Sequence, residues 1–380
     1  MTTNIELIPG LAGVPCAASK IADINGNEGK LYYRGYTIED LASNTTFEET
    51  SYLLLYGELP TKAQLAAFDA KLREHRRLKY KIIDVLKAMP DYGHPMNALQ
   101  ACVATMSMFY PARNVTDKHV QEESVIRLIA KLPTIVAAFH RVRHGDEAIQ
   151  PRDDLAHAAN FLYMTTGREP TEVEAKTLDA CLVLHAEHSM NASTFAARVV
   201  GSTLADPYTV ISSAIGALSG PLHGGANQEV LVMLDEIGSI EKTDAYINDK
   251  MDRKDKIMGL GHRVYKAKDP RATFMQGLAV KLFETMGVDT RYAIAKRIED
   301  MAFERLAQRG IYPNVDFYSG ILYAKLGIAP DMFTPIFAIA RVSGWLAHWL
   351  EQLQDNKIYR PDQVYAGYAP RAFKDMPSRG

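Results

Sequence analysis

The sequence predicts a mostly α-helical protein with a small β-hairpin near its N-terminus. After residue 36, apolar residues recur at helical spacing along almost the whole chain. Capping motifs and glycines mark the ends of several of these segments, and only residues 10–36 look extended. The length of 380 residues is enough for one large domain or two smaller ones.

The first predicted element is a hairpin around Asn25-Gly26, a dipeptide that favours turns. It lies between Ser19–Ile24 and Lys30–Tyr36, which are both rich in strand-prone residues. Because several residues separate the two strands, a loose turn is expected.

Helices are predicted from there onward. Thr46 and Glu49 have the spacing of a capping box, and Gly57 is placed to end the helix that they start. Thr61 and Gln64 repeat the signal for a helix to about residue 78, and Pro133 is expected to kink a later helix. Further helical segments are predicted at about 81–89, 95–109, 121–144, 152–166, 171–190, 193–204, 206–218, 227–237, 243–254, 271–286, 291–309, 315–326 and 333–353, followed by an extended tail from residue 355.

The composition limits the classes of function. With 43 basic and 45 acidic residues, the formal net charge is −2, which gives no electrostatic reason to expect nucleic acid or an anionic membrane as partner. The 3 cysteines are far apart, so a reducing, cytoplasmic location is predicted rather than a disulfide or zinc framework. The N-terminus does not have the pattern of a secretory signal. The apolar segment 333–350 is interrupted by Arg341 and His348, which indicates a buried helix rather than a membrane span.

Three glycine-containing stretches each carry one chemically capable side chain. In Ser219–Val230, His223 sits in a break between two predicted helices, with glycines on both sides. Glycines allow unusual backbone conformations and the close approach of a ligand. The stretch alone fits either a binding site or a structural turn.

The second stretch, 257–271, combines glycines with His262 and four cations. Exposed backbone N–H groups beside cations suit a phosphate-bearing ligand. Its G-L-G sequence is not a dinucleotide-binding fingerprint, because the third glycine and a preceding strand are missing. A helix terminus with solvated charges explains the same residues. The cations are Arg263, Lys266, Lys268 and Arg271.

The third stretch, 314–320, places Asp316 between Val315 and Phe317. A carboxylate that apolar neighbours desolvate has a raised pKa and can act as a general base. Asp316 would serve equally well as the N-cap of a helix that begins there.

Two histidines and two more arginines complete the candidates. His185 and His188 predict no metal site, because H-E-x-x-H and a cysteine cluster are absent, and they suit hydrogen bonds to a substrate carboxylate or carbonyl. Arg341 interrupts an apolar helix, so it must be paired or bind an anion. Arg271, Arg341 and Arg360 together could hold a di-acid, although Arg360 alone fits a surface charge equally well.

Taken together, these residues resemble the citrate synthase family, which includes 2-methylcitrate synthase. The resemblance covers nearly the whole chain, and the motifs occur in the family's order. It rests on K-L-Y-Y-R-G-Y-T-I-E-D-L-A at 30–42, L-H-A-E-H-S-M-N-A-S-T at 184–194, the three stretches above, F-T-P-I-F-A-I-A-R at 333–341 and D-N-K-I-Y-R-P at 355–361.

The resemblance implies an acyltransferase that condenses acetyl-CoA with oxaloacetate and water to give citrate and CoA. The steps are enolisation, aldol-type addition and thioester hydrolysis. It implies that Asp316 removes the methyl proton, that His223 hydrogen-bonds the thioester oxygen, and that His262 polarises the oxaloacetate carbonyl. Acetyl-CoA is then a co-substrate, and no permanently bound cofactor or metal is expected.

The same resemblance implies the binding residues. Arg360 is expected to reach the active site of a neighbouring subunit, which implies a homodimer and leaves a hexamer or larger assembly open. Lys266 is expected near a CoA phosphate. Oxaloacetate is expected to contact His188, Arg271 and Arg341, and the CoA adenine to contact Ile257, Met258, Gly259, Leu260 and Gly261.

The implied fold has a large helical domain, residues 1–223 and 322–380, and a small inserted helical domain, residues 224–321, that closes over the substrates. Two alternatives remain: a 2-methylcitrate synthase that uses propionyl-CoA, and an inactive family member that acts as an assembly scaffold. The intact His223, His262 and Asp316 argue against the scaffold. Ser189-Met190 departs from many relatives beside His188, and the acyl-chain preference and any inhibitors stay open.

Overall fold

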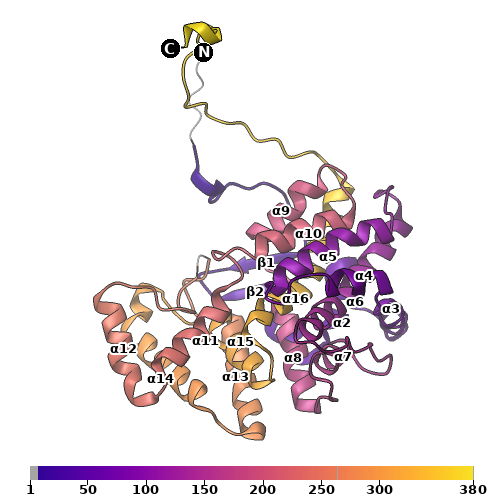
Figure 1. Ribbon diagram of the computed structural model, residues 1–380. Helices are drawn as coiled ribbons and strands as arrows, with labels where there is room; N and C mark the ends of the chain where they lie inside the picture. The colour runs from indigo at the N-terminus through magenta and orange to yellow at the C-terminus, as the bar shows by residue number, and fades with distance from the viewer. Residues whose placement is uncertain (1–6, 263, 380) are drawn as a thin grey trace.

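Helices form nearly all of the body of the computed structural model, which describes residues 7–262 and 264–379 (Figure 1). The strands are β1 (Ala22–Asn25), β2 (Lys30–Tyr33) and β3 (Tyr36–Thr37). The α-helices are α1 (Ile38–Asn44), α2 (Phe47–Tyr56), α3 (Lys62–His75), α4 (Tyr80–Lys87), α5 (Pro95–Phe109), α6 (Lys118–Arg143), α7 (His157–Thr166), α8 (Glu172–His185), α9 (Ala192–Gly201), α10 (Pro207–Leu218), α11 (Ala226–Ile237), α12 (Ile240–Asp252), α13 (Pro270–Met286), α14 (Thr290–Arg305), α15 (Val315–Lys325) and α16 (Phe333–Gln354). The mostly α-helical prediction is therefore confirmed.

The predicted hairpin is present. Strands β1 and β2 pair antiparallel, with Asn25 opposite Lys30, so Gly26 lies in the loop between them. Both strands are shorter than predicted, and β3, which pairs with β2, was not predicted from the sequence. A two-residue strand carries too little periodicity to be recognised from sequence.

The helix signals were mostly correct. Both predicted capping boxes form, at Thr46 and at Thr61, and Gly57 ends α2 with a φ of 96°. Pro133 lies inside α6, which continues through it as one element. The predicted helix over 171–190 is wrong at its end, because α8 stops at His185.

Residues 186–191 leave the helix because other elements hold their backbone. The Tyr33 hydroxyl accepts a hydrogen bond from the Glu187 N–H at 3.1 Å and donates to the Glu187 carbonyl at 2.8 Å. Ser189 has a φ of 51°, which a helix does not allow. His188 therefore sits on a bent, non-helical segment at the end of α8.

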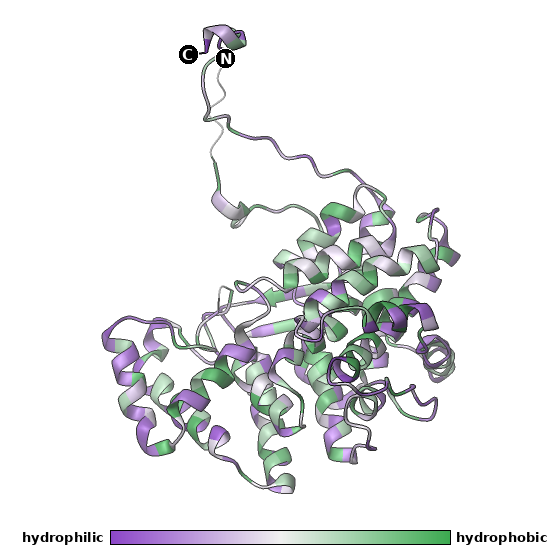
Figure 2. Ribbon diagram, viewed as in Figure 1, coloured by the Kyte–Doolittle hydropathy of each residue, from purple (hydrophilic) through white to green (hydrophobic). Residues whose placement is uncertain are grey.

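Helix α16 is the centre of the larger group of helices and is buried along almost its whole length. It packs against α2, α6, α8, α9 and α10. Figure 2 shows hydrophobic residues gathered on the helices of this interior and hydrophilic ones on the outer elements. This agrees with the prediction of a buried helix over 333–350, and none of the described helices has the length and apolarity needed to cross a membrane.

Helices α11 to α15 lie together at one end of the body (Figure 1). Within this group, α13 and α11 pack against α15, and α12 packs against α14. The segments at the two chain ends, from residue 7 to β1 and from residue 355 to 379, leave the body on the same side (Figure 1). The second segment is almost entirely exposed, which agrees with the extended tail predicted from residue 355.

Candidate active site

His223 lies in the turn between α10 and α11 and is half-buried. Its Nε2 atom is 2.9 Å from the Ser193 hydroxyl oxygen and accepts a hydrogen bond from the Ser193 backbone N–H at 3.3 Å. Because Nε2 is an acceptor, the proton of the neutral ring sits on Nδ1. Burial, with a smaller contribution from Arg341, lowers the pKa of His223 to about 4. The ring is therefore a neutral Nδ1–H donor at neutral pH.

His262 lies in the irregular segment before α13 and is held by its own loop. Its Nδ1 atom accepts the backbone N–H groups of Val264 at 3.0 Å and Tyr265 at 3.2 Å, so the proton of the neutral ring sits on Nε2. Burial, and then the positive charge of Arg271, lower the pKa of His262 to about 4. This ring is also a neutral donor, through the opposite nitrogen.

His188 joins the same cluster from the end of α8. Its ring centre is 5.4 Å from that of His262, and its Nε2 atom is 3.2 Å from the Tyr265 hydroxyl. Burial, and then Arg271, keep the pKa of His188 well below its usual value. The structure thus brings together two segments that lie more than 70 residues apart in the sequence.

Asp316 lies in the first turn of α15. The N-cap of this helix is Asn314, whose side-chain oxygen accepts the Asp316 N–H at 3.0 Å. The alternative that Asp316 is the N-cap of this helix is therefore wrong, and its carboxylate does not cap the helix. Burial raises the pKa of Asp316 to about 6, against the opposing effect of the nearby Arg271 and Arg341 guanidinium groups.

The backbone of 257–261 lies directly beside the start of α15. The Gly261 N–H donates to the Tyr312 carbonyl at 2.8 Å, and the Asn314 N–H donates to the Gly259 carbonyl at 2.9 Å. The Asn314 side chain also donates to the Gly261 carbonyl at 2.8 Å. These bonds fix the candidate CoA segment next to the candidate base. Lys266 is exposed nearby, whereas Arg263, another of the four predicted cations, lies outside the described residues.

Two of the three predicted arginines are buried at this site. Arg271 forms a bidentate ion pair with Asp269, with N–O distances of 3.0 and 2.7 Å. Burial alone would lower the pKa of Arg271, but the negative charge of Asp269 raises it. Arg341 donates from Nε to the His185 carbonyl at 2.7 Å, and its Nη2 has no hydrogen-bond partner among the described residues. Burial lowers the pKa of Arg341 to about 10.

Arg360 is not part of this cluster. It lies in the exposed segment that leaves the body after α16. The structure of a single chain therefore brings six of the seven predicted catalytic and oxaloacetate-contacting side chains to one region and leaves this one at the surface. Among the described residues, no group of three or more His, Cys, Asp and Glu is arranged to hold a metal ion.

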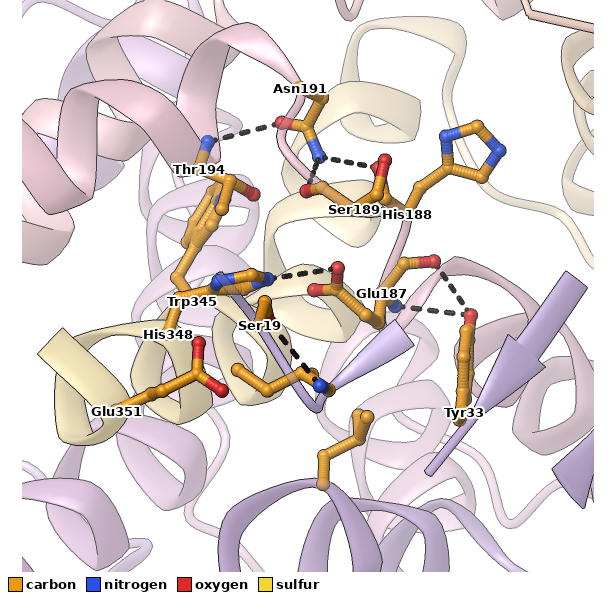
Figure 3. A network of polar contacts seen from close by, with 12 residues as sticks. Ser19, Tyr33, Glu187, His188, Ser189, Asn191, Thr194, Trp345, His348 and Glu351 are labelled. Atoms are coloured by element: carbon orange, nitrogen blue, oxygen red, sulfur yellow. Dashed lines mark hydrogen bonds and ion pairs between the residues drawn. The ribbon is translucent and has the colours of Figure 1, made fainter. Parts of the chain in front are cut away.

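A buried polar network beneath His188 was missed from the sequence. Figure 3 shows Glu187 between Tyr33 and His348, whose Nε2 is 3.1 Å from the Glu187 carboxylate. Arg198 donates to the other ring nitrogen of His348 at 3.1 Å and to Glu351 at 2.9 Å. The one available signal was the spacing of Arg341 and His348, which places both polar side chains on the same face of an apolar helix.

Comparisons with known proteins identify the family of the chain. Residues 10–362 match the family model described as "Citrate synthase, C-terminal domain". A citrate synthase from Synechocystis sp. is 54% identical over 379 residues, which cover 100% of this chain and 96% of the relative.

Solved structures of citrate synthases have the same fold. The crystal structure of the enzyme from Pyrobaculum aerophilum has a TM-score of 0.91 at 41% identity, and covers 98% of this chain and 95% of that one. The enzyme from Thermoplasma acidophilum, in a ternary complex with carboxymethyl coenzyme A and oxaloacetate, has a TM-score of 0.93 at 33% identity, with 98% of this chain and 100% of that one covered. None of these comparisons favours a methylcitrate synthase or an inactive scaffold. The chain therefore belongs to the citrate synthase family, and its activity is that of a citrate synthase, an acyltransferase.

Proposed function

We propose that the chain condenses acetyl-CoA with oxaloacetate and water, with His223, His262 and Asp316 as its catalytic residues. The observation that carries this proposal is the complementary state of the three groups. The neutral imidazoles of His223 and His262 present N–H donors. The carboxylate of Asp316 has a pKa raised to about 6. A general base works best when its pKa lies near the operating pH.

Asp316 is the base that removes a methyl proton from acetyl-CoA. A thioester methyl is a weak acid, so the charge that develops on the thioester oxygen must be stabilised at the same time. His223 supplies this through its Nδ1–H, since its Nε2 is already occupied by Ser193. General acid and general base together, each worth about 10²–10⁴-fold, make the enol accessible.

His262 acts on the second substrate. Its Nε2–H donates to the carbonyl oxygen of oxaloacetate, which makes the carbonyl carbon more open to attack by the enol. The two carboxylates of oxaloacetate are held by Arg271, Arg341 and His188. The buried Nη2 of Arg341, which has no partner within residues 7–262 and 264–379, supports this role, because a buried donor without a partner is costly until it binds an anion.

CoA binds along the 257–261 backbone, and Lys266 contacts a CoA phosphate. The hydrogen bonds between this backbone and residues 312–314 support the assignment, because they hold the adenine segment and Asp316 in one rigid unit. Acetyl-CoA is a co-substrate in this scheme. Hydrolysis of the citryl thioester then completes the turnover.

Residues 224–321 form the small domain that closes over the substrates, and residues 1–223 with 322–380 form the large domain. Closure would exclude water from the enol and align it with the carbonyl carbon, which can contribute roughly 7–11 kcal/mol. The grouping of α11 to α15 at one end of the body supports this division (Figure 1).

The active unit is a homodimer in which Arg360 completes the partner's oxaloacetate site. Arg360 is exposed, and its segment carries exposed apolar side chains that a second copy would cover. These are Ile358, Val364, Tyr365, Tyr368 and Phe373. We place the enzyme in the cytoplasm, because all 3 cysteines are free.

The test is the release of free CoA thiol from acetyl-CoA with and without oxaloacetate, with propionyl-CoA run in parallel. Oxaloacetate-dependent release with acetyl-CoA as the better substrate is expected. Equal or better use of propionyl-CoA would replace this proposal by methylcitrate synthesis, and no release with either would reject it. One methylene in a pocket is worth about 1–3 kcal/mol, so a moderate preference is expected rather than absolute exclusion.

A further inference from the structure

One face of α16 supports the whole segment that follows α8. Arg341, Gly344, Trp345 and His348 lie at positions i, i+3, i+4 and i+7, which share a helix face. Arg341 and His348 bind the His185 carbonyl and the Glu187 carboxylate. A Cβ atom on Gly344 would lie 2.4 Å from the Ala186 carbonyl oxygen, so the glycine lets the helix approach this closely.

Trp345 is the member of this face that reaches toward His223. Its indole N–H donates to the Ser193 hydroxyl oxygen at 3.1 Å, and that oxygen is 2.9 Å from the His223 Nε2. An indole N–H is only a donor, so the Ser193 oxygen must accept on this side. The single Ser193 proton is then directed away from Trp345, and the hydroxyl donates to the Asn191 side-chain oxygen at 2.7 Å.

We propose that Trp345 is a positioning residue for the enolisation step, which acts through Ser193 on His223. It fixes the Ser193 hydroxyl oxygen beside His223 Nε2, the atom that accepts the backbone N–H of Ser193. The ring proton then stays on Nδ1, the nitrogen that meets the thioester oxygen. Trp345 and Ser193 are both fully buried, so solvent water does not replace the indole donor. The inference rests on the proposed role of His223.

The chain contains its own control. It has 2 tryptophans, and the other, Trp349, lies one turn further along α16. Trp349 is also buried, at 1% exposure, but its indole N–H has no hydrogen-bond partner in the described part of the chain. Replacing either indole by a phenyl ring removes a similar volume from the same helix, whereas only the Trp345 replacement removes a hydrogen bond.

The experiment compares Trp345→Phe with Trp349→Phe in steady-state assays. Trp345→Phe is expected to lower kcat about 3- to 10-fold, the loss of one hydrogen bond, with the oxaloacetate KM within about twofold of wild type. Trp349→Phe is expected to leave kcat within about twofold. Ser193→Ala should lower kcat at least as much, and adding Trp345→Phe to it should cause no further loss, because both changes break one chain of bonds.

Equal losses in the two tryptophan variants, additive losses with Ser193→Ala, or a change confined to KM would overturn the inference. If Trp345→Phe does not fold, a second variant keeps the bicyclic shape. In the Trp349→Phe background Trp345 is the single tryptophan, so growth on benzothienylalanine replaces its N–H by sulfur at that site alone, and the same loss of kcat is expected. Inactivity of the wild-type chain would instead reject the proposed function.

Discussion

The two imidazoles proposed as catalytic are fixed in opposite ways. His262 is held by N–H groups two and three residues further along its own loop, whereas His223 is held by Ser193, which lies 30 residues earlier in the sequence. The first arrangement needs only a local backbone turn. The second requires α16, the segment after α8 and the turn after α10 to pack correctly at once. Positioning by local turns is tolerant of distant changes, whereas positioning by packing depends on the whole core.

The largest expected effect is the loss of either ring. His223→Ala and His262→Ala should each lower kcat by about 10²–10⁴-fold, because each removes a donor that stabilises developing negative charge. The two should differ in KM, since His262→Ala should also raise the oxaloacetate KM. Steady-state kinetics with both substrates varied would measure this, and a variant with near-normal kcat would remove that histidine from the mechanism.

One of the distant supports of the His262 loop lies at Gly26, and a single methyl group should break it. The Lys266 N–H donates to the Gly26 carbonyl at 2.9 Å, and a Cβ on Gly26 would lie 2.3 Å from the Val264 carbonyl oxygen. Gly26→Ala should therefore displace the loop and lower kcat/KM for oxaloacetate by about 10- to 100-fold. Gly277→Ala is the control, since that position on α13 has open space around it. Unchanged kinetics in Gly26→Ala would show that the Gly26 contact does not position the loop.

The pH dependence should show that neither histidine titrates in the working range. Burial lowers the pKa of both rings to about 4, whereas it raises that of Asp316 to about 6. The base works only when ionised, so kcat/KM for acetyl-CoA should be constant above pH 7 and fall about tenfold by pH 5. The profile over pH 5–8 measures this. If the residual activity of Asp316→Asn still fell between pH 7 and pH 5, the fall in kcat/KM would have to be assigned to another titrating group.

The smallest expected effect concerns the contact between His188 and Tyr265. Tyr265→Phe removes the hydroxyl that lies 3.2 Å from the His188 Nε2 but keeps the ring packing with His262. The loss of one hydrogen bond predicts an oxaloacetate KM about 2- to 10-fold higher, with kcat nearly unchanged. Oxaloacetate binding measured by calorimetry would test the same point without turnover. A drop in kcat with no change in KM would contradict it.

The sequence predicted the helical fold and most helix boundaries, because these depend on local patterns, whereas the roles of the three catalytic candidates stay predictions. Gly57 and the capping box at Thr46 are signals of this kind. The end of α8 was missed, since the Tyr33 hydroxyl that replaces helical bonds at Glu187 comes from a strand more than 150 residues away. Ser193 and Trp345 were missed for the same reason: their role exists only once α16 lies beside the turn of His223. The N-cap at Asn314, by contrast, was within reach of a local argument.

Both indole rings of the chain lie on α16, within one turn of each other and below the site. Ultraviolet emission selected for tryptophan therefore comes entirely from this one helix. In the Trp349→Phe background it comes from the single ring that touches Ser193. Binding of oxaloacetate or CoA could thus be followed by tryptophan fluorescence without any added dye, through a ring that contacts Ser193 beside His223.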